Sequence, residues 1–165
     1  MIERNLTELA RPSMGLECLA GRARVAVPVS DILEVVEYQV TPPPPLASRF
    51  VGGLGSLNGK VVISIAIDFP WERVPPRRVT QGILLRAAHA DGPVWAIEVS
   101  EVRAFIELAT ERPLEPSGSE AKPKFISFRQ ASDGRTVGWV DVAALLAELG
   151  FRAQGPAKGA ALEAV

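Results

Sequence analysis

With 165 residues, the chain is long enough for one domain with a sizeable core, or for two small lobes that share one. Hydrophobic residues make up 47% and charged residues 22%, and the net charge is −1, which excludes a disordered chain and leaves no electrostatic basis for binding nucleic acid or an anionic membrane surface. The 14 glycines and 14 prolines favour many turns and short strands over a few long helices.

The N-terminal segment, residues 1–14, is predicted to be a flexible leader. Charged residues interrupt its apolar residues, so it lacks the apolar core of a signal peptide. No stretch of the chain approaches the roughly 18 uncharged apolar residues of a transmembrane helix. We therefore expect a cytoplasmic protein with no direct membrane insertion.

Short strands are predicted from the start of the folded part. Two apolar runs, 15–20 and 25–29, flank a polar turn and predict a hairpin. Ser30 can cap a single helical turn over 31–34. The run 35–40 is rich in β-branched residues and predicts a further strand.

The strongest local signal is Asn58-Gly59, which follows an extended connection predicted at the four prolines 42–45. Asn-Gly supplies the two positive φ angles that a type I′ turn needs, and apolar residues flank it on both sides. The segment 54–67 is therefore predicted to be a β-hairpin. Its second strand has Ser64 as its only polar residue, so we expect that strand to lie between two layers.

The second half of the chain continues the pattern of short strands. Strands are expected at 79–87, 93–99, 102–108, 125–130 and 136–140, the last two forming a hairpin around Asp133-Gly134. In the strand 102–108, alternation places the apolar residues on one face, namely Val102, Ala104, Ile106 and Leu108.

One helix is predicted near the end of the chain. Asp141 caps it and Gly150 ends it, and the Ala/Gly-rich tail 151–165 is expected to be disordered. The fold class is thus all-β with one C-terminal helix, a barrel or sandwich of about nine or ten short strands rather than an α/β enzyme scaffold.

The glycine cluster 52–60 resembles a phosphate-binding loop. A Walker loop needs glycine five residues before its Gly-Lys pair and serine or threonine after it, but Leu54 and Val61 stand at these places. The dinucleotide-binding pattern also fails, because Asn58 stands where its third glycine is needed. We interpret these glycines as turn residues.

Cys18 and His89 are the only cysteine and the only histidine. A disulfide, a cysteine zinc site or Ser-His catalysis would lack partners, so no cofactor and no metal is expected. Cys18 lies in an apolar strand, where an inert thiol is expected. A small β-barrel enzyme that uses Cys18, His89 and scattered carboxylates stays an alternative. Trp71, in a proline-rich loop, is a candidate contact residue if it is exposed.

Four segments in order, between about residues 15 and 149, resemble the CheW-like domain family. The segment 27–35 (VPVSDILEV) is similar to the family's passage from a strand through one turn into V-x-E-I. The segment 50–62 (FVGGLGSLNGKVV) resembles the family's hairpin around N-L-R-G, and 96–102 (AIEVSEV) resembles its g-i-v-v-D-x-V strand. Residues 125–126 with 137–146 resemble its closing l-l-D-x-x-x-L-L segment.

The resemblance implies one domain over residues 15–150 that consists of two interlocked five-stranded SH3-like β-barrel lobes and has no catalytic site. It also implies an adaptor that couples the cytoplasmic tip of a methyl-accepting chemoreceptor to the regulatory domain of a CheA-type histidine kinase in bacterial signal transduction. Carried over by position, the receptor-side residues are Ile32, Leu33, Glu34, Leu57 and Asn58. On the kinase side the resemblance points to Leu84, Val99 and Val102, for which core packing is an equally good account.

Several positions depart from the family pattern. The family's arginine in N-L-R-G is Asn58 here, and its asparagine is Ser56. Asparagine cannot replace the bidentate donor of arginine. At three further positions, Ile63 stands where the family has proline, and Ala66 and Ser100 stand where it has aspartate. A second hypothesis is therefore a divergent member that has lost or changed one partner, or that serves a specialised pathway such as the Frizzy-type system of gliding bacteria.

Overall fold

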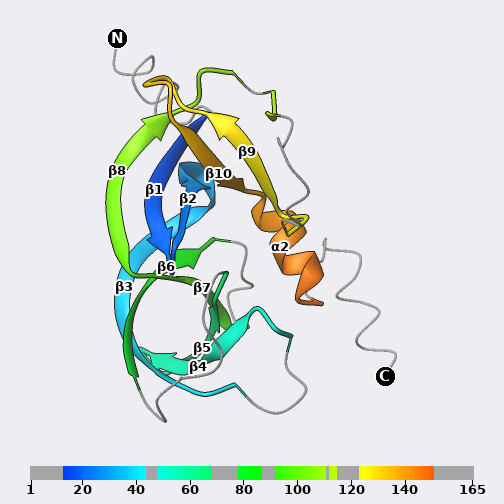
Figure 1. The fold of residues 1–165 in the computed structure, drawn as a ribbon. Helices are drawn as coiled ribbons and strands as arrows, with labels where there is room; N and C mark the ends of the chain where they lie inside the picture. The colour runs from blue at the N-terminus through cyan, green and yellow to red at the C-terminus, as the bar shows by residue number, and fades with distance from the viewer. Residues whose placement is uncertain are drawn as a thin grey trace.

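Two five-stranded β-structures and one α-helix make up the part of the chain that the structure describes (Figure 1). We call the β-structures lobe 1 and lobe 2. The computed structural model describes residues 13–43, 48–67, 78–86, 92–110, 112–114 and 123–150. Most of the predicted leader, the predicted tail, Trp71 and His89 lie outside these residues.

Lobe 1 combines strands from both ends of the chain. Its sheet has the order β8-β1-β2-β10-β9, in which β2 and β10 are parallel and the other pairs antiparallel. The strands are β1 (Met14–Ala20), β2 (Ala23–Pro28), β8 (Glu101–Glu107), β9 (Ile126–Gln130) and β10 (Thr136–Val140). Just beyond the two edge strands, Leu108 and Ala131 form a bridge, and the N–H of Ala109 donates to the carbonyl of Gln130 at 2.9 Å. The sheet therefore curls until its two edges meet.

Lobe 2 is a closed barrel with the strand order β3-β4-β5-β7-β6. Its strands are β3 (Ile32–Thr41), β4 (Val51–Leu57), β5 (Lys60–Ile65), β6 (Arg78–Leu85) and β7 (Val94–Val99). The 3-10 turn η1 (Val29–Asp31) leads into it from β2. The chain leaves lobe 1, forms all of lobe 2 and returns to lobe 1 at β8 (Figure 1). This arrangement confirms the predicted all-β fold with one helix and two interlocked five-stranded lobes.

The largest hydrophobic core lies between the lobes, and we call it the interlobe core. Successive side chains of β1 and of β7 point to opposite faces of the strand. One face contacts the interlobe core, and the other faces the interior of the strand's own lobe. Cys18 and Ile97 face the interlobe core, whereas Gly15 contacts Trp139 inside lobe 1 and Ala96 belongs to the interior of lobe 2. The helix α2 (Val142–Glu148) covers the interlobe core with Val142, Leu145 and Leu146.

Local turn and cap chemistry agrees with the sequence at two places. Asn58 and Gly59 have φ angles of 51° and 79°, as a type I′ turn requires, and they join β4 to β5 in the predicted hairpin. The carboxylate of Asp141 accepts a hydrogen bond from the N–H of Ala144 at 3.0 Å, which confirms the predicted helix cap.

The helical turn predicted at 31–34 was wrong in position. The turn is η1, it ends at Asp31, and Ser30 makes no side-chain cap hydrogen bond there. The residues from Ile32 onward are extended because they pair with β6. Tertiary pairing has therefore overridden the local capping signal.

The prediction of one shared face for the apolar residues of β8 was also wrong. Val102 lies opposite Cys18 and packs against the interlobe core, whereas Ile106 lies opposite Gly15 and faces the interior of lobe 1. The register between β1 and β8 shifts between Leu16 and Cys18. Such a bulge moves the residues that follow it to the other face of the sheet.

The glycine cluster has a packing role that the turn interpretation missed. Gly59 lies in the hairpin turn, but Gly55 lies within β4, where a Cβ atom would approach the Tyr38 ring to 3.1 Å. From the other side, a Cβ atom at Gly82 of β6 would lie 2.6 Å from the same ring. These glycines leave room for Tyr38 inside lobe 2.

We expect Gly82→Ala to lower the free energy of unfolding by about 1–3 kcal/mol, because the added methyl group overlaps Tyr38 in a packed interior. Urea unfolding followed by tryptophan fluorescence measures the change. Gln81→Ala, at the exposed neighbouring position on β6, is the control and should stay within about 0.5 kcal/mol of the wild type. Equal stability of the two variants would contradict this account of the glycine.

Candidate functional site

The start of β3 carries three of the predicted receptor-side residues. Ile32 is partly buried and packs against the interlobe core. Ile32 pairs with Leu85 and Glu34 pairs with Leu84, so Leu33 is the extra residue of a bulge. The Leu33 side chain is 55% exposed, and Glu34 is exposed as well. The bulge thus offers a partner one apolar and one anionic side chain on a strand fixed by its pairing to β6.

The other two predicted receptor-side residues lie at the hairpin turn of lobe 2. Leu57 is partly buried and packs against the interior of lobe 2, while Asn58 is exposed. The hairpin pairs with β3 in the antiparallel sense, Val40 with Gly55 and Thr41 with Leu54, so its turn extends back along β3 to about the level of Glu37. At about 3.3 Å per residue, the two groups are on the order of 10 to 15 Å apart along β3. The five predicted residues therefore form two groups, one at the start of β3 and one on the adjoining hairpin.

The predicted kinase-side residues lie mostly in the core. Leu84 belongs to the interior of lobe 2 and Val99 to the interlobe core, and each is 4% exposed. Val102 is partly buried at the margin of the interlobe core. Packing accounts for Leu84 and Val99, so of these three side chains Val102 alone has surface to offer a partner.

Exposed apolar side chains that the sequence analysis did not single out occur on several strands. They are Val35, Val61, Val79, Phe105 and Leu114. Phe105 is 66% exposed and lies opposite Leu16, a residue of the interlobe core, on the β1–β8 ladder. Ile32 and Val102 pack against this core, Leu33 follows Ile32 in the chain, and Phe105 pairs with Leu16. We call these four residues (Ile32, Leu33, Val102 and Phe105) the junction rim. Because the β8 bulge sets which way Phe105 faces, alternation alone could not identify it.

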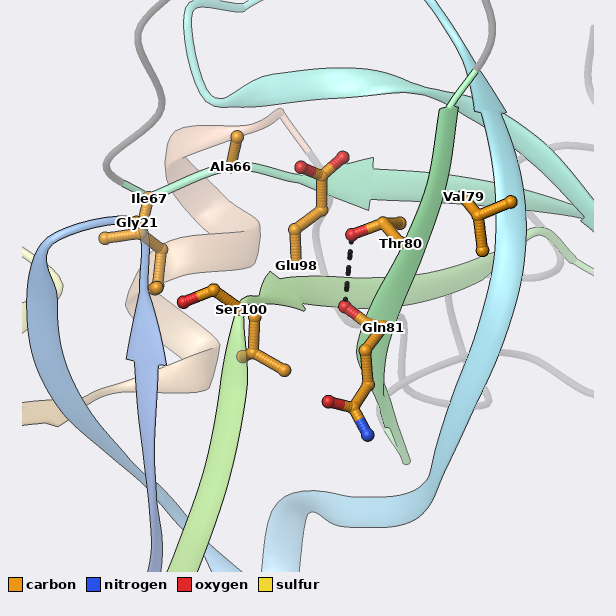
Figure 2. Close-up of a pocket in the computed structure, with 10 residues that line it drawn as sticks. Gly21, Ala66, Ile67, Val79, Thr80, Gln81, Glu98 and Ser100 are labelled. Atoms are coloured by element: carbon orange, nitrogen blue, oxygen red, sulfur yellow. Dashed lines mark hydrogen bonds between the residues drawn. The ribbon is translucent and has the colours of Figure 1, made fainter.

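A cavity of about 400 Å³ lies where the ends of β1, β5 and β7 meet β6 (Figure 2). The residues that line it are Ala20, Gly21, Ala66, Ile67, Val79, Thr80, Gln81, Glu98, Val99 and Ser100. Among the described residues that line it, Glu98 is the one ionisable side chain. Figure 2 shows the Glu98 and Thr80 side chains on the same side of their strands and the Gln81 amide pointing the opposite way.

The carboxylate of Glu98 is held by a relay of hydroxyl groups inside lobe 2. Glu98 is 6% exposed, and the Ser64 hydroxyl donates to its Oε1 at 2.5 Å. The Tyr38 hydroxyl lies 2.7 Å from the Ser64 oxygen. Because the Ser64 hydroxyl has a single proton, which Glu98 accepts, Tyr38 is the donor to Ser64. At Gly52 a Cβ atom would lie 2.6 Å from Oε1, so a glycine is needed there to seat the carboxylate.

A second buried carboxylate, that of Glu17, lies on β1 and is 1% exposed. Arg135 approaches both of its oxygens, at 3.2 and 3.1 Å. The guanidinium groups of Arg24 and Arg103 lie 3.8 and 3.9 Å from Oε1. This arrangement joins β1, β2, β8 and the turn before β10 through one charge, as a structural ion-pair network does.

Cys18 does not have the properties of a nucleophile. Its side chain is fully buried, and burial, with a smaller effect from the Glu17 charge, raises the pKa of its thiol to about 12. A reactive cysteine needs the opposite, a partly exposed thiol with a lowered pKa. The alternative of a cysteine-based enzyme therefore loses its main residue.

Metal-binding side chains are not clustered in the described part of the chain, where no three or more His, Cys, Asp or Glu residues are placed to hold an ion. Within the same residues, no helix has the length and apolarity needed to cross a bilayer.

Comparisons with known proteins agree with this architecture. The sequence profile of the CheW-like domain family matches residues 15–150, which include both lobes. The crystal structure of the scaffolding protein TtCheW from Thermoanaerobacter tengcongensis has a similar fold, with a TM-score of 0.56 and 14% sequence identity, and the match covers 80% of this chain and 86% of that one. No curated protein sequence matches the chain.

We expect Cys18 to resist alkylation in the native protein, because at pH 8 a thiol with this pKa is ionised in only about one molecule in ten thousand. Intact-mass spectrometry after treatment with iodoacetamide should show no adduct under native conditions. The same treatment in denaturing urea is the control and should add one label, since the chain has one cysteine. Native labelling at the rate of a free thiol would restore the cysteine-enzyme alternative.

Proposed function

Because this chain belongs to the CheW-like domain family, we propose that it is a non-catalytic adaptor that couples a methyl-accepting chemoreceptor to a CheA-type histidine kinase. The observation that carries this proposal is the family match over residues 15–150. CheW-like domains form a scaffold family without catalysis of their own. The similar structure from Thermoanaerobacter tengcongensis is likewise described as a scaffolding protein. The proposed place of action is the cytoplasmic end of a receptor array.

The proposed mechanism is differential contact. An adaptor without chemistry transmits a signal when one partner's conformation changes how well the adaptor binds the other. The interlobe core supports such coupling, since both lobes pack on it and surfaces on either lobe are held in fixed relation. The adaptor therefore holds its receptor-binding and kinase-binding surfaces in a fixed geometry.

The receptor tip is proposed to dock on the junction rim, next to Glu34. Leu33 and Phe105 are large, exposed apolar groups there, and such side chains supply most of the binding energy in protein interfaces. The hairpin turn at Asn58 lies beside the middle of β3, and Val61 on the same hairpin is 55% exposed. We assign this hairpin surface to the flank of a receptor tip that runs along β3.

We expect Leu33→Asp to weaken binding of a receptor-tip fragment by about tenfold or more, because it places a charge in an apolar contact. Surface plasmon resonance with the purified receptor tip and the purified kinase regulatory domain measures both affinities. Val79→Asp is the matched control, since Val79 is a similarly exposed apolar residue (59%) that lies away from the rim. Absence of wild-type binding to both fragments would refute the adaptor proposal.

The second candidate, a family member that has lost or changed one partner, is favoured by Asn58. This residue is exposed at the position of the family's arginine and offers only a short amide. We expect Asn58→Arg to strengthen association with the receptor fragment if the lost guanidinium is what limits binding. Asn58→Lys is the matched control, because both variants place a long side chain at a positive φ but lysine lacks the bidentate donor. If neither variant changes the affinity, the departure at this position is neutral.

A further inference from the structure

The end of the β4–β5 hairpin, residues 56–61, extends beyond the strands on either side of it, and we call it the hairpin tip. Strand β4 pairs with β3 as far as Gly55, and β5 pairs with β7 from Val62 onward. Within the described residues, the tip is therefore paired only with itself. Leu57 is partly buried against the interior of lobe 2, and the rest of the tip is exposed. Such a segment can open locally while the lobe stays folded.

Asn58, in the hairpin tip, has a side-chain amide directly before a glycine. The backbone nitrogen of the residue after an asparagine can attack its Cγ atom, and a glycine has no side chain to obstruct that attack. Even a Cβ atom added at Gly59 would meet nothing within 4 Å, so the space around this nitrogen is open. The chain's other asparagine, Asn5, precedes Leu6, whose side chain hinders the same attack.

The closed turn restrains this attack. Asn58 has a φ of 51° and is the one non-glycine residue with a positive φ in the described part of the chain. In a type I′ turn the nitrogen of Gly59 is directed away from the side chain of Asn58, so the two atoms meet only when the hairpin tip opens. Opening also releases Asn58 from a left-handed conformation, which is unfavourable for a residue with a Cβ atom.

We propose that Asn58 is a modification site, where it is converted without an enzyme to aspartate and isoaspartate. The nitrogen of Gly59 loses its proton and bonds to Cγ of Asn58, the bond from Cγ to Nδ2 breaks, and ammonia leaves with that proton. One water molecule then opens the resulting succinimide ring. Cleavage between the nitrogen and Cγ gives aspartate, and cleavage between the nitrogen and the backbone carbonyl carbon of residue 58 gives isoaspartate.

Both products change the hairpin tip. Aspartate places a negative charge at the turn, where the chain has a neutral amide. Isoaspartate adds one carbon to the backbone, so a two-residue type I′ turn can no longer close in the same register. The modification is independent of the proposed coupling role, and only its effect on a docked receptor tip rests on that role.

Incubation of the full chain in native, mildly alkaline buffer tests the site. Trypsin then releases peptide 50–60, between Arg49 and Lys60, in which Asn58 is the only asparagine. Mass spectrometry measures the deamidated fraction, protein isoaspartyl methyltransferase labels the isoaspartate, and a sample digested at time zero corrects for reaction during digestion. We expect Asn58 to react faster than Asn5 by about tenfold or more. A rate at Asn58 no higher than at Asn5 would overturn the proposal.

Gly59→Ala tests the role of the glycine. We expect it to slow the reaction at Asn58 by about threefold or more, because the methyl group obstructs the attacking nitrogen. Gly134→Ala is the matched control, since Gly134 is a turn glycine with a similar φ (89° against 79°) and equally open surroundings. This control should react as the wild type does. A folded Gly59→Ala protein that reacts as fast as Gly134→Ala would contradict the proposed attack.

A comparison with the unfolded wild-type chain tests local opening and needs no variant. The rate at Asn58 in denaturing urea, multiplied by the unfolded fraction in native buffer, is the rate expected if the whole chain had to unfold first. We expect the native rate to exceed this product by about tenfold or more, because only the hairpin tip has to open. Agreement between the native rate and the product would show that the tip does not open by itself, and the site would then be absent from the folded protein.

Discussion

The interlobe core is the interaction on which the rest of the structure depends. Neither β-structure encloses it: the outer faces of both sheets and the buried face of α2 enclose it together. Strand β7 consequently has buried residues on both faces, with Ile97 in the interlobe core and Ala96 inside lobe 2. A strand that packs on both sides has no free surface for a partner. In the described residues, accessible surface is left at rims, turns and strand ends, where Leu33, Phe105 and the Glu98 cavity are found.

Among the described residues each lobe contains one buried carboxylate, and the two are stabilised in different ways. Glu17 is surrounded by guanidinium groups from three arginines, so its charge is matched by cations at the surface. Glu98 instead accepts from a hydroxyl relay in a barrel whose glycines make room for it. Buried charge is costly unless it is paired or hydrogen-bonded. The first arrangement joins strands, whereas the second leaves an anionic group facing a cavity.

Features set by a few neighbouring residues could be predicted from the sequence. The Asn58-Gly59 turn and the Asp141 cap depend on local backbone chemistry, and both are present. Features set by strand pairing could not be predicted. The bulge between β1 and β8 decides that Val102 and Ile106 face different cores, and it depends on a partner strand distant in the chain. The glycines of β4 likewise looked like turn residues, because the ring and carboxylate that need their space come from Tyr38 and Glu98.

The interleaving of the lobes also has a consequence for the order of assembly on the ribosome. Lobe 2 is encoded by one uninterrupted stretch, from Ile32 to Val99, whereas lobe 1 needs strands made before and after it. The outer face of β1 can therefore dock on β7 once lobe 2 has been synthesised, but its inner face lacks Trp139 until β10 emerges. The first strands made are among the last to be fully covered, and the nascent chain carries their exposed apolar surface through most of its synthesis.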